Sequence, residues 1–284
     1  MLNQIAVWFS KKRFLRASQS GNVFHIRSQI KAVDPETINT ALIHAANCGQ
    51  DDVVKVLLEG GADPQAKDDQ EFTAFIWAAY QGYEDVVQVM LDFGIGSNQR
   101  TKDGRTALMW AVKAGRIDTV QCFLDSDKAD LTAKDGSGFT ALMHAVYNGH
   151  NEIVKNLMNA GADPNFRANN EETALMWAAD RGQSKTVQIL LDAGADPKAA
   201  DNDGKTVLLW AATQKHGRTG YRVRGGGVGA MGNDYLNLDA IKILLEAGTD
   251  LNAQDKNGET ALNKAKNARY TEIVEILQNA DVTN

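Results

Sequence analysis

The chain has 284 residues, a formal net charge of −6, and ordinary proportions of charged (23%) and hydrophobic (43%) residues. This composition supplies enough apolar side chains for a core and excludes an intrinsically disordered chain. No run approaches the roughly 18 apolar residues that a membrane-spanning helix needs. The two cysteines are too scattered for a disulfide framework or a zinc site. We therefore expect a soluble, cytoplasmic protein with no metal ion and no membrane span.

The charge is unevenly distributed along the chain. Residues 1–31 carry six basic and no acidic side chains, and residues 213–238 carry four basic and one acidic, so the remainder has a net charge of −15. An acidic body with two basic segments lacks the continuous basic face that nucleic-acid binding requires. Nucleic acid is therefore not an expected partner.

The first predicted element is an N-terminal helical segment over residues 1–16. Its apolar residues Leu2, Ile5, Trp8 and Phe9 share one helical face and are followed by a basic cluster. They either cover the exposed end of the structure that follows or bind a membrane surface. We favour the cover over the end of the fold.

A repeat dominates the rest of the sequence. A Thr-Ala-Leu triplet or a close variant recurs at spacings of 33, 33, 34, 33, 33 and 54 residues, the last being one period plus a 21-residue insertion. The triplets start at Thr40, Thr73, Thr106, Thr140, Thr173, Thr206 and Thr260. In each unit we expect the threonine to cap a first helix by accepting a bond from an unpaired backbone N–H.

Glycines divide each unit into its parts. One set follows the first helix and is placed to end it in a left-handed conformation: Gly49, Gly82, Gly115, Gly149 and Gly182. A second helix with apolar residues at i, i+3 and i+4 follows and closes at another glycine: Gly61, Gly94, Gly161, Gly194 or Gly248. The chain then turns through a short loop rich in Asp, Asn and Gly.

Helix, turn, helix and hairpin at a 33-residue period resemble the ankyrin repeat, over nearly the whole chain. The form Thr-Ala-Leu-Met-Trp-Ala is similar to a variant found in bacterial ankyrin proteins. The resemblance implies an all-α ankyrin-repeat solenoid of helix-turn-helix units with short hairpin loops. We expect a single domain over 1–284, made of an N-terminal cap and degenerate repeat (1–36), six repeats (37–256) and a C-terminal capping repeat (257–284).

One position on each first helix carries an aromatic or a basic residue, and its neighbours on the same face vary from repeat to repeat. The resemblance implies that this face lines a concave groove where partner proteins bind. The tryptophans alone are better explained as packing spacers, whereas the varied residues three and four positions later favour a partner. The predicted binding residues here are Trp77, Tyr80, Trp110, Lys113, His144, Tyr147, Trp177, Arg181 and Trp210.

The insertion, at about 217–237 in the sixth repeat, is glycine-rich and basic. It is either functional or disordered, and we include Arg218, Tyr221, Arg222 and Arg224 among the predicted partner-binding residues. Residues 227–232 fit the dinucleotide pattern G-x-G-x-x-G, but that pattern needs a strand before it and a βαβ unit around it. We therefore expect no cofactor.

The predicted function is a non-enzymatic protein–protein interaction module: an adapter, scaffold, inhibitor or dedicated chaperone. No arrangement of histidine or cysteine residues has catalytic or chelating spacing. The alternative is a ligand- or nucleotide-binding protein, or an enzyme, whose site is built from the insertion. We favour a monomer that binds another protein.

Overall fold

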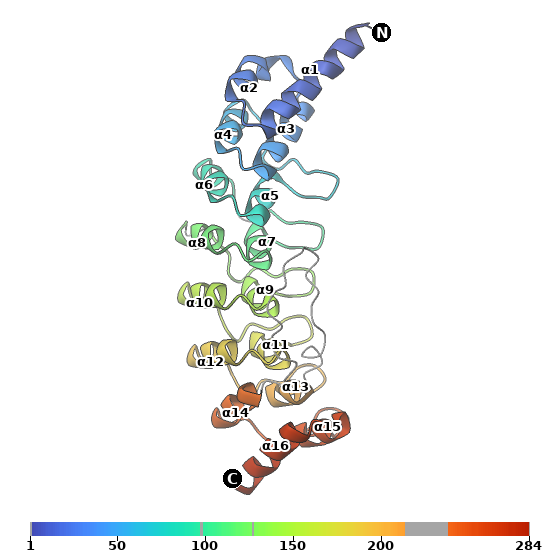
Figure 1. Ribbon diagram of the computed structural model, residues 1–284, viewed down its shortest axis with the longest axis vertical. Helices are drawn as coiled ribbons and strands as arrows, with labels where there is room; N and C mark the ends of the chain where they lie inside the picture. Colours follow the sequence, from blue (N-terminus) through green and yellow to red (C-terminus); the bar gives the residue numbers. More distant parts are fainter. Residues whose placement is uncertain (1, 97–98, 127, 214–237, 284) are drawn as a thin grey trace. The chain divides into compact units, whose positions relative to one another are not determined.

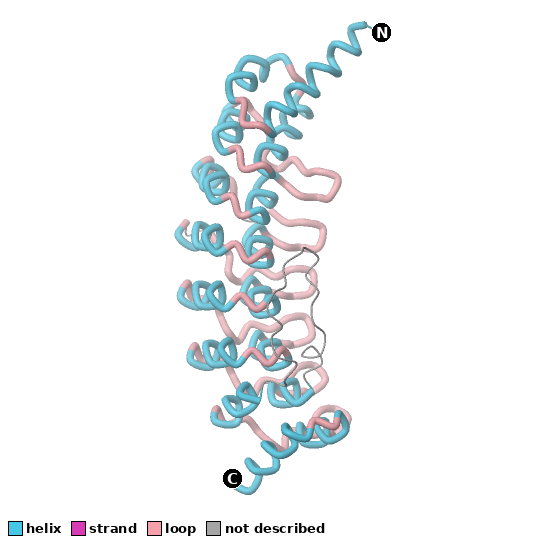
Figure 2. The backbone as a smooth tube through the Cα atoms, in the orientation of Figure 1, coloured by secondary structure: helices cyan, strands magenta, loops and turns pink. Residues whose placement is uncertain are grey.

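The computed structural model describes residues 2–96, 99–126, 128–213 and 238–283. These residues form helices joined by loops and turns, without a strand among them, as the helix and loop colours of Figure 2 show. Isolated antiparallel bridges join Lys67 to Thr73, Arg100 to Thr106 and Ala200 to Thr206. The predicted all-α helical repeat fold is confirmed.

The chain packs as two compact units, Met1–Gly136 and Ser137–Asn284. The helices of the first unit are labelled in Figure 1: α1 (Leu2–Gln19), α2 (Val23–Gln29), the 3-10 helix η1 (Ile30–Ala32), α3 (Pro35–Asn47), α4 (Asp51–Glu59), α5 (Ala74–Gln81), α6 (Glu84–Asp92), α7 (Ala107–Lys113) and α8 (Ile117–Asp125).

The second unit repeats the same plan. Its helices are α9 (Ala141–Asn148), α10 (Asn151–Asn159), α11 (Ala174–Asp180), α12 (Ser184–Asp192), α13 (Val207–Thr213), α14 (Leu238–Glu246), α15 (Ala261–Ala268) and α16 (Thr271–Thr283). The predicted insertion falls in the interval between α13 and α14, where residues 214–237 lie outside the described residues. The predicted boundaries of the cap and of the individual repeats stay predictions.

Each unit has two helical layers. In the first unit, α1, α3, α5 and α7 pack in one layer and α2, α4, α6 and α8 in the other. In the second unit, α9, α11, α13 and α15 form one layer and α10, α12, α14 and α16 the other. Within both units, the loops that precede the first helices extend on the first-layer side (Figure 1).

Threonine capping explains where most first helices begin. The side chains of Thr73, Thr106, Thr140, Thr173 and Thr260 each accept a hydrogen bond from the backbone N–H three residues later. Such a cap stabilises a helix by about 1 kcal/mol. The capping prediction is confirmed at these five positions.

At Thr206 the prediction fails, because the buried Oγ1 has no hydrogen-bond partner among the described residues. It is also wrong at Thr40. There α3 begins earlier, at Pro35, because Asp34 accepts a bond from Thr37 N–H at 3.1 Å and proline already has the helical φ angle. Thr40 lies inside the helix, where its hydroxyl donates to the carbonyl of Glu36 at 2.9 Å. Asp34 supplies the capping acceptor and Pro35 the helical φ angle, so the helix starts there without a threonine cap.

The glycines end the helices as predicted. Both predicted sets have positive φ values, between +62° at Gly182 and +88° at Gly61. At Gly138 the space for a side chain is also missing, because an added Cβ would stand 2.5 Å from the backbone nitrogen of Asn169 in the next loop. Neighbouring loops approach this closely because backbone bonds join them, such as Asn169 N–H to Ser137 O at 3.2 Å.

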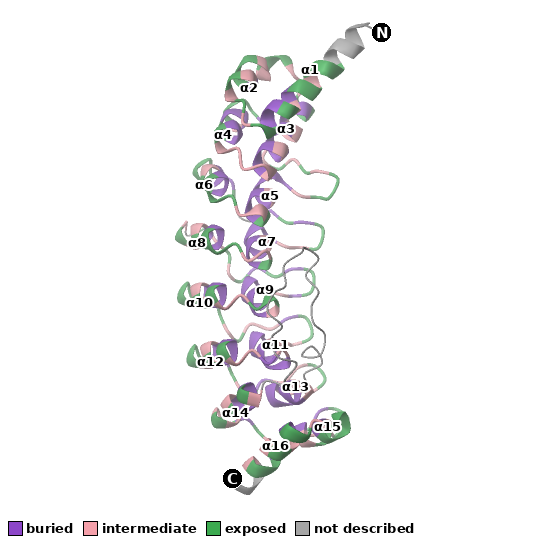
Figure 3. Ribbon diagram, viewed as in Figure 1, coloured by how far each residue is buried: buried purple, intermediate pink, exposed green. Residues whose placement is uncertain are grey.

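The core lies between the two layers of each unit, where Figure 3 shows the buried faces of the helices. Small residues such as Ala78 and Ala79 are fully buried and let neighbouring first helices approach closely. Larger side chains fill the space toward the second layer; Phe75 and Phe123 meet edge to face with centroids 5.4 Å apart. Each fully buried large side chain contributes roughly 1.5–3 kcal/mol.

The N-terminal helix packs differently from the prediction. Among residues 8–19 of α1, whose side chains the structure describes, Phe14, Ala17 and Ser18 are buried. The predicted face residues Leu2 and Ile5 lie outside this range. Trp8 and Phe9 are 53% and 60% exposed, so they do not cover the end of the fold. The expectation of an end cap is therefore wrong for these two residues, because the helix packs against its neighbours through residues five to ten positions later.

Candidate functional site

Aromatic side chains of the first unit gather beside α5 and α7. The Phe72 ring lies between Trp77 and Trp110, with its centroid 4.9 Å from each. Tyr80 meets the same two rings edge to face at 6.1 and 5.6 Å and is 36% exposed. We call Phe72, Trp77, Tyr80 and Trp110 the first aromatic patch.

The second unit has a corresponding cluster beside α9, α11 and α13. The Phe139 ring is 5.6 Å from that of Trp177, and Trp177 contacts both Tyr147 at 5.3 Å and Trp210 at 5.2 Å. We call Phe139, Tyr147, Trp177 and Trp210 the second aromatic patch. His144 packs 5.6 Å from Phe139 and is only 5% exposed, so it lies beneath this patch.

The tryptophans are held by the loops that precede their helices. Trp77 Nε1–H donates to Oδ2 of Asp68 at 2.6 Å, and Trp110 Nε1–H donates to Thr101 Oγ1 at 3.3 Å. Trp210 Nε1–H donates to Oδ2 of Asp201 at 3.0 Å. In each case the acceptor stands nine residues before the tryptophan, and the ring is partly buried.

The aspartates also fold the loops themselves. Asp68 Oδ1 accepts the backbone N–H groups of Gln70 and Phe72, both at 2.9 Å. Asp201 Oδ1 accepts those of Asp203 and Lys205, also at 2.9 Å. One carboxylate therefore shapes the turn with one oxygen and fixes the tryptophan with the other.

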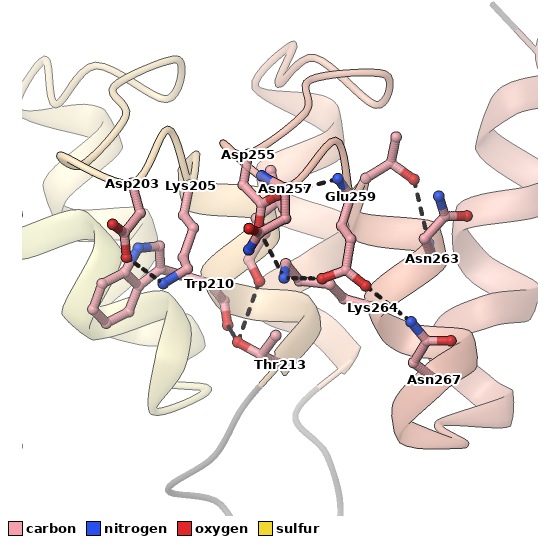
Figure 4. A network of polar contacts seen from close by, with 12 residues as sticks. Asp203, Lys205, Trp210, Thr213, Asp255, Asn257, Glu259, Asn263, Lys264 and Asn267 are labelled. Carbon is pink, nitrogen blue, oxygen red and sulfur yellow. Dashed lines mark hydrogen bonds and ion pairs between the residues drawn. The ribbon is translucent and has the colours of Figure 1, made fainter.

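In the last repeat an ion pair replaces this hydrogen bond. Lys264 stands at the tryptophan position, with its Nζ 2.8 Å from Asp255 Oδ2 and 2.6 Å from Glu259 Oε2 (Figure 4). Burial opposes both charges, yet hydrogen bonding between the two side chains holds the pKa of Asp255 below and that of Lys264 above the usual value. Asp255 Oδ1 accepts from Asn257 and Glu259 N–H, as in the other loops.

Cationic side chains border both aromatic patches. Lys113 Nζ is 4.5 Å from the Trp110 ring centroid, and the Arg105 guanidinium is 5.3 Å from it. Burial, and then the charge of Arg105, lowers the pKa of Lys113. The Arg181 guanidinium lies 3.9 Å from the Tyr147 ring, and its buried Nε has no hydrogen-bond partner among the described residues.

Two hollows adjoin the first aromatic patch. A cleft of about 690 Å³ between α3 and the next loop is lined by Trp77, His44, Glu36 and Asp69, among others. A smaller hollow of about 430 Å³ is lined by Phe72, Thr101 and Trp110. Burial lowers the pKa of His44, whose Nδ1 lies 3.4 Å from Gln19 Nε2.

The structure thus brings the predicted residues together within each unit. Trp77, Tyr80, Trp110 and Lys113 meet in the first unit, and Tyr147, Trp177, Arg181 and Trp210 in the second, above His144. Phe72, Phe139 and the aspartates of the loops were not predicted from the sequence pattern. The predicted residues Arg218, Tyr221, Arg222 and Arg224 lie outside the described residues.

The described part of the chain contains no group of three or more His, Cys, Asp or Glu residues placed to hold a metal ion. None of its helices has both the length and the apolar content needed to cross a bilayer.

Comparison with known families agrees with the geometry. A model described as ankyrin repeats (3 copies) matches residues 14–100, 91–168 and 142–219. A second, described as ankyrin repeats (many copies), matches residues 235–278. No curated protein matches the chain. The chain belongs to the ankyrin repeat family, whose members are protein–protein interaction modules and are typically not enzymes.

Proposed function

We propose that this chain binds a partner protein through the two aromatic patches and the cations beside them. Tyrosine, tryptophan and arginine dominate the binding energy of protein interfaces, and both patches combine these residue types on a rigid helical layer. The hydrogen bonds from the indoles of Trp77, Trp110 and Trp210 to the loops fix these three rings, so little conformational entropy would be lost on binding.

The observation that carries the proposal is the stacking of Arg181 on Tyr147. The guanidinium is oriented by the ring at 3.9 Å, and its Nε–H still has no acceptor among the described residues. A planar guanidinium oriented in this way suits a carboxylate or backbone carbonyl of a partner, which would bind its terminal N–H groups.

The test compares capture of proteins from the native cell extract by wild type and by variants of each patch. We expect Tyr80→Ala and Arg181→Ala to lose a protein that wild type retains, and Arg181→Lys to lose it too, because lysine lacks the planar group. Gln188→Ala on the exposed face of α12 is the control. Retention of the same proteins by all four variants would contradict the proposal.

We also propose, from the sequence alone, that Arg218, Tyr221, Arg222 and Arg224 contribute to binding. Replacing residues 217–237 by a short glycine-serine turn should reduce affinity and preserve cooperative unfolding, since a longer loop changes closure entropy by only about 1–2 kcal/mol. Undiminished binding would remove these residues from the proposal. We further propose that the module is non-enzymatic, cytoplasmic and monomeric, acting as an adapter, scaffold, inhibitor or dedicated chaperone; light scattering of the purified protein tests the monomer.

A further inference from the structure

Over residues 11–19 the helix α1 has a buried side and an exposed side, whereas Trp8, Phe9 and Ser10 are all exposed. Phe14, Ala17 and Ser18 are buried against the first unit. At about 100° per residue, these positions cover one side of the helix within an arc of roughly 100°. A second arc of roughly 140° on the opposite side is exposed, and it carries Trp8, Phe9, Lys12, Arg13 and Arg16.

The exposed arc begins with two large aromatic rings. Trp8 and Phe9 are 53% and 60% exposed and meet edge to face, with centroids 5.0 Å apart. Lys12 Nζ lies 4.7 Å from the centroid of the Trp8 ring, so a cation stands directly over the aromatic surface. Two adjacent aromatic rings left in water carry a free-energy cost that a partner surface would remove.

The rest of the exposed arc is basic. Lys11, beside the arc, is paired with Asp34 at 2.8 Å. No acidic side chain of the described residues forms an ion pair with Lys12, Arg13 or Arg16. Residues 1–31 contain no acid at all, whereas the remaining residues have a net charge of −12. Positive charge is therefore concentrated at this helix in an otherwise acidic protein.

We propose that α1 docks onto an anionic lipid surface. Trp8 and Phe9 enter the interface between headgroups and acyl chains, and Lys12, Arg13 and Arg16 contact headgroup phosphates. Tryptophan and phenylalanine beside lysine and arginine are the combination that interfacial helices use. Phe9 and Arg16 are about 10 Å apart along the helix axis, a spacing that a tilted helix accommodates within the headgroup layer.

A convex helix face also fits a broad surface better than it fits a pocket that takes a single side chain. The docking is electrostatic at long range and apolar at contact, so it requires both halves of the arc. This inference is independent of the aromatic patches, because it uses none of their residues.

The test is co-sedimentation of the full chain with vesicles of phosphatidylcholine alone and of phosphatidylcholine containing phosphatidylserine. We expect binding to the anionic vesicles only, weakening as salt is added. Combined Lys12→Gln, Arg13→Gln and Arg16→Gln substitutions should weaken it on the order of a hundredfold. Trp8→Ala with Phe9→Ala should weaken it at least about tenfold.

Matched controls separate this effect from general changes in charge or apolar surface. Phe93 is 43% exposed at the end of α6, and Lys55, Lys155 and Lys185 are exposed on second-layer helices. Phe93→Ala, and the three lysines changed together to glutamine, should bind anionic vesicles like wild type. Thermal unfolding of every variant should match wild type, because all these side chains are exposed.

Four results would overturn the proposal. The first is equal binding to both kinds of vesicle, and the second is unchanged binding by the variants of α1. The third is a dimer in light scattering that Trp8→Ala with Phe9→Ala dissociates, which would assign the face to a second copy of this chain. The fourth is binding of free phosphoserine in place of vesicles, which would assign the basic residues of α1 to a soluble anion.

Discussion

The indole N–H of Trp77 donates a 2.6 Å hydrogen bond to Asp68, nine residues earlier, and the other oxygen of the same carboxylate accepts two backbone N–H groups of its loop. The same arrangement recurs between Trp210 and Asp201. In the last repeat Lys264 takes the place of the tryptophan against Asp255. The loop and the first helix of a repeat are thus joined by one side chain.

Removing that carboxylate should therefore destabilise the repeat. We expect Asp68→Ala to lower the free energy of unfolding by about 2 kcal/mol, because it leaves the Trp77 indole and two backbone donors without their acceptor. Urea unfolding followed by circular dichroism measures the change. The neighbouring Asp69→Ala is the matched control, because Asp69 is exposed and should change stability by less than about 0.5 kcal/mol. Equal effects of the two substitutions would remove the structural role of Asp68.

The last repeat offers a substitution that exchanges one form of this link for the other. Lys264→Met should cost about 3 kcal/mol, because it leaves the buried carboxylate of Asp255 without its cation. Lys264→Trp should retain most of the stability, since an indole N–H fills the same role against Asp68 and Asp201. Hydrogen exchange of α15 and α16 reports the effect locally, and Lys266→Met on the exposed side of α15 is the control. If the Met and Trp variants at position 264 behave alike, the two links are not equivalent.

His44 predicts a pH dependence of stability. Burial lowers the pKa of His44 in the folded state below its ordinary value of 6.5, so the folded state binds a proton there less readily than the unfolded chain. The contribution of His44 to stability is complete above about pH 6.5 and is lost as the pH falls through the lowered folded-state pKa. We expect His44→Gln to flatten the decrease in melting temperature on acidification below pH 6.5. Parallel curves for variant and wild type would show that His44 makes no such contribution.

The aromatic patches separate binding from stability. Tyr147→Ala and Arg181→Ala should weaken partner binding by about 1–3 kcal/mol with little change in melting temperature. Trp110→Ala should lower the melting temperature as well, because its partly buried ring packs against Phe72 and its indole bonds to Thr101. Titration calorimetry with the captured partner and thermal unfolding of each variant provide the two measurements. A large loss of stability in Arg181→Ala would assign that residue to the fold instead.

The repeat period determined most of what could be predicted. A threonine that caps and a glycine that ends each helix are local signals, so the elements and their order could be read from spacing alone. Thr40 was misassigned because Asp34-Pro35 starts the helix upstream and overrides the repeat. Trp8 and Phe9 were misassigned because a helical face specifies which residues align, and not which face packs against the fold.

The candidate site could be predicted only in part. Tyr80 and Arg181 follow from their helical offsets from Trp77 and Trp177, and Tyr147 follows from its offset from His144. Phe72 and Phe139 precede the capping threonines in loops, where helical periodicity carries no information. The aspartates of the loops were also missed, although Asp68, Asp201 and Asp255 all stand nine residues before the aromatic or basic position. That recurring interval was the available signal, and it reflects a contact between a loop and the helix after it.

Site-specific photo-crosslinking tests the central claim most directly, namely that the aromatic patches contact a protein. A photoreactive phenylalanine derivative would replace Tyr80, Tyr147 or, on the exposed face of α12, Gln188. After irradiation in native cell extract, we predict a covalent adduct with one and the same protein from position 80 or 147 and none with it from position 188. Adducts from position 188 alone, or equal adducts from all three positions, would contradict the account.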